Sequence, residues 1–168
     1  MKTRCLLYVF IIASIAVMAQ NCPSGQEHIK SIEMSWEEEI LEYTNKERKK
    51  HGLKALEMRG DLVYAARYHA KDMAEENYFE HDSYDRKHGN LVLSCSNFDR
   101  IAAFANYDYL AENISAGRIS AQEVVKGWMK SKGHRKNILN SNLRYIGVGY
   151  YYHKDSEYKH YWVQNFGG

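Results

Sequence analysis

Apolar residues recur every three or four positions in three stretches of the chain, which predicts three amphipathic helices. These stretches are residues 35–52, 61–79 and 120–133. Each opens with a side-chain oxygen suited to an N-cap, from Ser35, Asp61 and Ser120. Glu38 and Glu123 follow two of these caps at the third position, the spacing of a capping box. Gly52 and Gly133 mark the expected ends of the first and third helices.

Near the end of the chain the apolar pattern changes from helical spacing to alternation. Residues 144–152 and 161–166 alternate, and a charged link separates them, which predicts an antiparallel hairpin. Residues 81–109 are expected to be irregular, with a short helix before Glu112, itself placed in a turn of small residues. Helices followed by terminal strands predict an α+β domain, with helices packed on an antiparallel sheet.

The first residues resemble a secretory leader. Lys2 and Arg4 precede a run that is almost wholly apolar, and small residues precede Gln20, which predicts a signal peptide over residues 1–19. The run is short for a membrane span, although an uncleaved anchor is the alternative. We therefore expect a tether over residues 20–34, a single domain over 35–168, and a secreted protein, periplasmic or at the cell surface if bacterial.

Charge and cysteine content narrow the possible partners. Loss of the two leader cations lowers the net charge from +2 to zero, which argues against a nucleic-acid partner. Cleavage of the leader also leaves no membrane-spanning stretch. Cys5 leaves with the leader, and Cys22 and Cys95 remain in an oxidising compartment. The sequence leaves open whether these two cysteines pair.

Four polar residues stand out by local context: His81, Glu112, Glu123 and His134. Each also has a simpler explanation, since Glu123 suits a capping acid and His134 suits a cation at a helix end. His69 falls on the apolar stripe of the second helix, so we expect a hydrogen-bonded packing residue rather than a ligand. Standard metalloprotease, paired-cysteine, serine-hydrolase and phosphate-loop motifs do not occur.

An ordered set of segments carries a resemblance to a known family. These segments are ILEYTNKERKKHGLKAL, AARYHAKDMAEENYFEHDS, LAENIS, EVVKGWMKSKGHRKNIL, YIGVGYYY and YWVQNFG. Together they resemble the CAP superfamily, which includes cysteine-rich secretory proteins, venom allergens, pathogenesis-related proteins and bacterial SCP-like proteins. The low cysteine count is similar to the short bacterial-type branch.

The resemblance implies a three-layer α-β-α sandwich whose cleft is lined by His81, Glu112, Glu123 and His134. It also implies that His81 and His134 bind a divalent metal, often zinc (Zn²⁺), with the acids orienting water or imidazole from outside the metal. The chain departs from the family pattern at Ala111, where glycine is usual, and at residues 83–86. The second departure puts the loop beside His81 in question.

Three functions follow from the resemblance and from the missing nucleophile motif. The first is a binding module for a lipid, a sterol or a protein, with a metal-dependent cleft. The second is a metal-dependent hydrolase of peptides or esters that uses a zinc-bound water, with Glu112 and Glu123 as catalytic candidates. The third is a non-catalytic scaffold in which the polar residues hold helices to the sheet.

Overall fold

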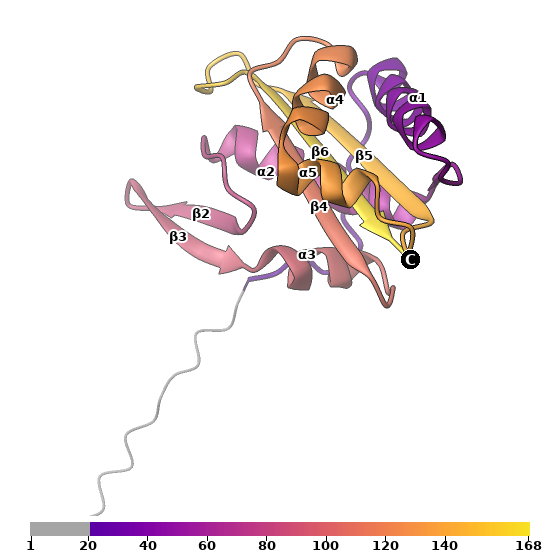
Figure 1. Ribbon diagram of the computed structural model, residues 1–168. Helices are drawn as coiled ribbons and strands as arrows, with labels where there is room; N and C mark the ends of the chain where they lie inside the picture. Colours follow the sequence, from indigo (N-terminus) through magenta and orange to yellow (C-terminus); the bar gives the residue numbers. More distant parts are fainter. Residues whose placement is uncertain (1–20) are drawn as a thin grey trace, which may run out of the picture.

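Helices and strands alternate along residues 21–168, the part of the chain that this computed structural model describes (Figure 1). The helices are α1 (Met34–Lys50), α2 (Gly60–Glu75), α3 (Asn97–Phe104), α4 (Ala121–Lys130) and α5 (Lys132–Ile138). The strands are β1 (Glu57–Met58), β2 (Ser83–Lys87), β3 (Asn90–Cys95), β4 (Leu110–Ala116), β5 (Tyr145–Tyr152) and β6 (His160–Gly167). The predicted signal peptide, residues 1–19, lies outside the described residues.

The central sheet has four strands in the order β1-β5-β6-β4. The predicted terminal hairpin is present as β5 and β6, which pair from Tyr145↔Gly167 to Tyr152↔His160. Strand β4 pairs antiparallel with β6 and leaves its other edge free of strands. Short β1 is the exception to the antiparallel pattern, because it pairs parallel with β5.

Helices cover both faces of this sheet, which confirms the α-β-α sandwich. Helices α1, α4 and α5 lie on one face, and α2 lies on the other, where α3 contacts it (Figure 1). Strand β6 shows why both faces are covered: Trp162 and Phe166 join the core beneath α1 and α4, whereas Tyr161 and Val163 join the core beneath α2. A strand with apolar side chains on both faces needs a helix on each face to exclude water.

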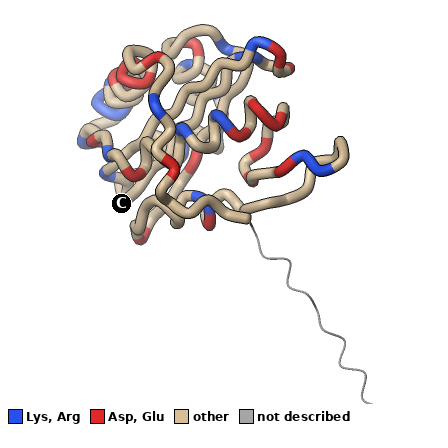
Figure 2. Tube along the Cα trace, turned by 180° about the vertical axis from the view of Figure 1, so that it is seen from behind, with Lys and Arg blue, Asp and Glu red and all other residues tan. Residues whose placement is uncertain are grey.

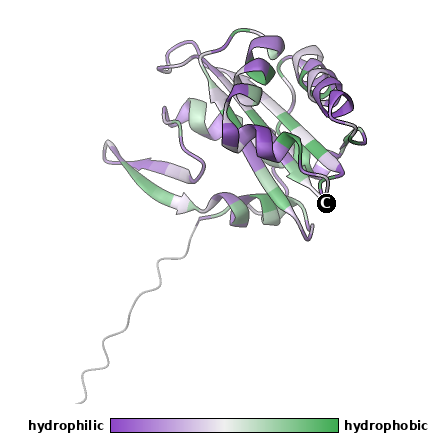
Figure 3. Ribbon diagram, viewed as in Figure 1, coloured by the Kyte–Doolittle hydropathy of each residue, from purple (hydrophilic) through white to green (hydrophobic). Residues whose placement is uncertain are grey.

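Hydrophobic residues, in green, concentrate in the sheet, while α5 is strongly hydrophilic (Figure 3). Basic and acidic residues are interspersed along the trace seen from behind (Figure 2). Among the described residues, no helix has the length and apolarity needed to cross a bilayer.

Two glycines let α2 approach the sheet at backbone distance. A Cβ on Gly147 would stand 2.0 Å from the Leu62 carbonyl carbon, and one on Gly149 would stand 2.3 Å from that of Ala66. Both positions are therefore closed to larger residues unless α2 moves away. This close approach fixes α2, and with it the loop that follows α2.

Two predicted helix starts were wrong. Helix α1 begins after Glu33 rather than after Ser35, whose hydroxyl donates to the Glu33 carboxylate (2.6 Å). Helix α2 begins after Arg59, and Asp61 lies in its first turn, where it accepts from the Leu62 backbone NH (2.8 Å). Ser120 is confirmed as the N-cap of α4, since its hydroxyl accepts from the backbone NH of Glu123 (3.3 Å).

Residues 81–109, expected to be irregular, contain the β2–β3 hairpin and the expected short helix, α3. The hairpin turns through His88 and Gly89, both with positive φ (51° and 84°), as a two-residue turn between twisted strands requires. The structure also corrects the placement of Glu112, which lies in strand β4 and not in a turn. Ala111, where glycine was expected, also lies in β4 and outside the positive-φ positions, so its Cβ costs no backbone strain.

The predicted helix over 120–133 is two helices. Ser131 adopts extended backbone (φ −85°, ψ 125°) and separates α4 from α5. Gly133 and His134 therefore lie inside α5, not at the end of α4. Hydrogen bonds stabilise the break on both sides. The Ser131 NH donates to the Trp128 carbonyl (3.1 Å), and the Ser131 carbonyl accepts from the Arg135 NH (2.9 Å).

The segment before α1 is attached to the body of the domain. Cys22 and Cys95 form a disulfide that closes a separation of 73 residues. Further along, Gly25 passes so close to α3 that a Cβ there would lie 2.0 Å from the Ala103 carbonyl oxygen. The His28 ring stacks on Tyr64 of α2, with 4.3 Å between the ring centroids. The disulfide joins this segment to the end of the β2–β3 hairpin.

Candidate functional site

The site lies at the free edge of β4, where the loop after α2 meets α3 and α5. A hollow of about 330 Å³ opens there. Its walls come from these four elements and include His81, Asp82, Phe98, Glu112 and Asn137. An open sheet edge suits a site because its side chains can be reached from solvent while the strand holds them in register.

Glu112 is the buried centre of the site. Its Oε1 accepts from His81 Nδ1 (2.9 Å), and its Oε2 accepts from the Arg100 guanidinium. With its amide oriented to satisfy both neighbours, Asn165 also donates to Oε2 (3.0 Å) and accepts from Ala66 NH (3.2 Å). Burial is the largest single effect and would raise the pKa of Glu112, but the Arg100 charge and the contacts with the neighbouring histidines together outweigh it and lower the pKa to about 2. The carboxylate is therefore ionised at neutral pH.

Arg100 was missing from the sequence prediction and holds the site together. Its side chain is fully buried on α3. Besides Glu112, it donates to the His81 backbone carbonyl (2.8 Å) and to the Ser83 hydroxyl (3.2 Å). The Arg100 guanidinium thus fixes both the Glu112 carboxylate and the backbone of His81.

His81 presents its ring to the hollow. Its side chain is 47% exposed, although Nδ1 is held by Glu112. The bond to Glu112 raises the pKa of His81 above its ordinary value of 6.5, against an opposing effect of burial. In the neutral ring, the proton on Nδ1 donates to Glu112, so the Nε2 lone pair is the one left for a ligand.

His69 is a packing residue, as the apolar stripe predicted. It is fully buried, and its Nε2 lies 3.0 Å from the Glu80 backbone carbonyl, next to His81. Burial lowers the pKa of His69 to about 3, so the ring stays neutral. The neutral ring donates from Nε2 and fixes the residue that precedes His81.

His134 approaches the site from α5. Its backbone carbonyl accepts from the Asn113 amide (3.2 Å), and Asn113 follows Glu112 in β4. Burial, together with the charge of His81, lowers the pKa of His134 below 6.5. An imidazole that stays neutral at physiological pH keeps a lone pair for a metal. One turn further, Asn137 donates to the Glu112 carbonyl (3.1 Å) and fixes α5 against β4.

Glu123 is not joined to the other three by any contact that the structure records. Its side chain is exposed in the first turn of α4, and its recorded hydrogen bond is the backbone one to Ser120. This bond makes Ser120 the cap, and the structure records no bond from the Glu123 carboxylate that would complete a capping box. The structure therefore brings His81 and Glu112 into direct contact and sets the backbone of His134 against Asn113, the neighbour of Glu112. His134 is not among the residues that line the hollow, so the places of its ring and of Glu123 in the cleft stay predictions.

Within residues 21–168, no group of three or more histidine, cysteine, aspartate or glutamate side chains is arranged to hold a metal ion. A metal at this site would therefore rest on the two imidazoles, with water or a bound ligand at the remaining positions. Neutral imidazole at His134, and a carboxylate-oriented imidazole at His81, fit that donor set.

Comparison with curated proteins gives relatives from Bacillus subtilis (strain 168). The protein YkwD is 42% identical over 135 residues, which are 80% of this chain and 48% of YkwD. The membrane protein YlbC is 36% identical over 143 residues, which are 84% of this chain and 37% of YlbC. The chain therefore spans less than half the length of either relative.

Solved structures share the fold. An extracellular protein containing an SCP domain from Bacillus anthracis str. Ames superposes with a TM-score of 0.66 at 32% identity, over 80% of this chain and 41% of that one. An outer surface protein from Borrelia burgdorferi has a TM-score of 0.68 at 22% identity, over 82% of this chain and 96% of that one, and shows the fold alone.

The model of the cysteine-rich secretory protein family, CAP, matches residues 41–166. That range includes β1, β4, β5 and all of β6 except Gly167, together with all four predicted site residues. The chain therefore belongs to the CAP family.

Proposed function

We propose that this protein is a secreted binding module whose cleft, at the free edge of β4, binds a divalent metal ion through His81 and His134. The observation that carries this proposal is the His81–Glu112 hydrogen bond (2.9 Å), with Glu112 itself held by Arg100. A carboxylate bonded to one ring nitrogen fixes the tautomer and directs the other nitrogen outward, as metal-ligating histidines require. Imidazole ligands favour zinc among the common divalent ions.

Secretion is supported by two independent observations. The Cys22–Cys95 disulfide would persist in an oxidising compartment and would be reduced in a cytosol. The matched protein from B. anthracis, 32% identical, is described as extracellular. The signal peptide predicted over residues 1–19 provides the route.

Among the ligand classes expected, the hollow favours a protein partner. At about 330 Å³ it is at the small end of ligand pockets, and it is too small to bury a whole sterol or lipid. Phe98 and Leu110 form an apolar part, and Asp82, Asn97 and Asn137 form a polar part. A side chain or chain end of a protein partner would fit this mixture and complete the coordination of the metal.

Binding is better supported than hydrolysis. A zinc-bound water needs a carboxylate free to accept its proton. Both oxygens of Glu112 are already occupied, by His81 on one side and by Arg100 and Asn165 on the other. The low pKa of Glu112, about 2, also makes it a weak base. The hydrogen bonds of Glu112 therefore suit a residue that orients the His81 ring.

Calorimetric titration of the purified protein with zinc chloride tests the proposal. We expect zinc affinity to fall by at least about tenfold in His81→Ala and in His134→Ala, because each removes one of two protein ligands. His88→Ala is the matched control, since His88 is exposed at the tip of the β2–β3 hairpin. Wild-type affinity in both cleft variants would exclude the metal site.

A further inference from the structure

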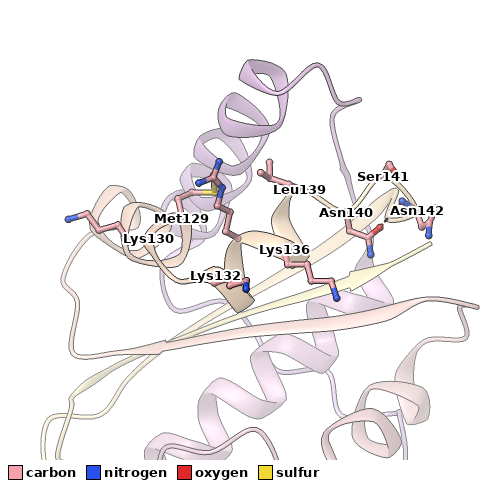
Figure 4. A pocket seen from close by; sticks show the side chains of 9 residues that line it. Met129, Lys130, Lys132, Lys136, Leu139, Asn140, Ser141 and Asn142 are labelled. Atoms are coloured by element: carbon pink, nitrogen blue, oxygen red, sulfur yellow. Dashed lines mark hydrogen bonds between the residues drawn. The ribbon is translucent and has the colours of Figure 1, made fainter.

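A second and larger hollow lies on the other side of α5, away from the His81–Glu112 pair. It measures about 810 Å³. Its walls come from the end of α4, from α5 and from the loop after α5 (Figure 4). Lys130, Lys132, Arg135 and Lys136 line it, and no acidic residue does. We call this feature the basic hollow.

The cations of the basic hollow have no acidic partners in the part of the chain that the structure describes. Lys130, Lys132 and Lys136 form no ion pair there, and Arg135 contacts His51 Nε2 (3.3 Å) instead of a carboxylate. The full chain carries a net charge of only +2, so this concentration is local. Like charges gathered in a concave surface produce a positive potential that attracts anions.

The far wall of the hollow is held in place from inside the protein. Arg48 of α1 is buried and donates to the carbonyls of Ile138 (2.7 Å), Asn140 (2.9 Å) and Leu143 (3.2 Å). The loop tightens further where Asn140 Oδ1 accepts from Asn142 NH (2.9 Å). A wall fixed before binding loses little conformational entropy when a ligand arrives.

The basic hollow continues into a neighbouring one between α1 and α4. The second hollow measures about 420 Å³ and shares Met129 and Lys130 with the first. It adds Lys46 and Lys126, which form no ion pair among the described residues, and its wall also carries Lys50 and Glu47, which pair with each other (2.6 Å). A track of cations across three helices suits a ligand with several negative charges in a row rather than a single ion.

We propose that the basic hollow binds a linear polyanion that carries phosphate groups. The guanidinium of Arg135 and the neighbouring ammonium groups suit tetrahedral oxyanions, and Met129 and Leu139 supply an apolar floor for the linking atoms. The cations follow one another around α4 and α5, so an open track of this kind suits a flexible chain that can bend along it. The site is separate from the metal cleft, because Asn137 faces that cleft and Lys136 faces this hollow.

Binding of inorganic polyphosphate, followed by fluorescence anisotropy at two salt concentrations, tests the proposal. The test variant is Lys132→Glu/Lys136→Glu, and the control is Lys30→Glu/Lys154→Glu, which makes the same change in net charge at exposed sites outside the hollow. We expect affinity to fall by roughly tenfold or more in the test variant only, since two charge-assisted contacts are lost. Affinity of the wild type should also fall as salt rises.

Thermal unfolding of both variants, and Lys132→Gln/Lys136→Gln as a gentler substitution, would show that any loss is not a folding defect. Absence of polyphosphate binding, or an equal loss in test and control variants, would overturn the proposal. Tighter binding to phosphatidylglycerol vesicles or to poly-glutamate, with the same dependence on Lys132 and Lys136, would also overturn it in favour of a membrane or an acidic protein. His81→Ala should leave polyphosphate binding unchanged, which separates this site from the proposed metal cleft.

Discussion

The Nδ1 atom of His81 lies 2.9 Å from Oε1 of Glu112, and this contact joins the loop after α2 to the free edge of β4. One partner is half-exposed and the other is buried, with side-chain exposures of 47% and 1%. The pair therefore connects the interior charge network to the surface of the cleft. Its protonation, its stability and its metal affinity should all respond when either residue changes.

The first prediction concerns the titration of His81. Glu112 favours the protonated ring, so the pKa of His81 should lie above 6.5 in the wild type and fall in Glu112→Gln. The contribution of this ion pair to stability is full below pH 6.5 and is lost as pH rises through the raised pKa. Zinc binding has the opposite dependence, because metal and proton compete for the ring. NMR titration of the His81 Hε1 proton would measure the shift, and equal pKa values in both proteins would contradict it.

The second prediction concerns the buried charge of Arg100. In Glu112→Gln the guanidinium stays buried and loses its counter-charge, so the free energy of unfolding should fall by about 3 kcal/mol. Urea denaturation would measure the loss. Glu123→Gln is the control, since the exposed Glu123 side chain should change stability by less than about 0.5 kcal/mol. A large effect at Glu123 would revive the scaffold function, in which that residue holds helix to sheet.

The third prediction concerns acid sensitivity through His69. Its pKa is about 3 in the folded protein and about 6.5 when unfolded, so its stabilising effect is full above pH 6.5 and is lost as pH falls toward 3. Between pH 6.5 and 4.5, stability should fall by about 1 kcal/mol per pH unit from this residue. Glu112, with an ordinary pKa of 4.5 lowered to about 2, contributes only below that window.

Urea midpoints of the wild type and His69→Gln across this window would test the assignment. The glutamine can still donate to the Glu80 carbonyl but cannot take up a proton. The variant should therefore show a flatter dependence on pH, and parallel curves for the two proteins would assign the acid sensitivity to other groups.

The fourth prediction concerns the Cys22–Cys95 disulfide. Its sequence separation of 73 residues implies, by chain entropy, a stabilisation of about 4 kcal/mol. Cys22→Ser/Cys95→Ser should lower the unfolding free energy by that order, and a reducing agent should destabilise the wild type but not the variant. Quantitative thiol labelling of the unreduced protein would find two free thiols if the bond were absent.

The fifth prediction compares two glycines with opposite surroundings. Gly147→Ala should destabilise the protein by about 3 kcal/mol, because the new Cβ would meet the α2 backbone at 2.0 Å. Gly133→Ala should stabilise it by roughly 0.5–1 kcal/mol, because Gly133 lies in α5 with nothing within 4 Å of the added Cβ. Thermal unfolding would measure both, and a Gly147→Ala protein as stable as the wild type would show that α2 is free to move.

Alternation was enough to predict the terminal hairpin, because Ile146 and Val148 face one buried side and the two strands are separated by a charged link. The β2–β3 hairpin was missed, since its apolar residues Leu91 and Leu93 remain exposed and its turn is His-Gly rather than Asn-Gly. The observed helix starts differ from the predicted ones because backbone conformation, and not the presence of a side-chain oxygen, decides which residue caps a helix.

The site could be predicted only in part from the sequence. Local context singled out His81, Glu112 and His134, but only the family resemblance grouped them in one cleft, since their spacing along the chain says nothing of contact. Arg100 could not be found, because its partners Glu112 and His81 lie 12 and 19 residues away and meet it only through folding. The one hint of its burial was that Arg100 adjoins the apolar Ile101, and both prove to be the buried residues of α3.

A line of side-chain amides crosses the domain from the cleft to α1. Asn137 donates to Asn113 (2.9 Å), Asn113 to Gln164 (3.1 Å), and Gln164 to the hydroxyl of Thr44 (2.7 Å). Helix α1 is therefore not interchangeable with any other amphipathic helix of the same length. A transplanted helix with the right apolar stripe and no hydroxyl at this position would leave a buried amide unpaired, at a cost of about 1–3 kcal/mol.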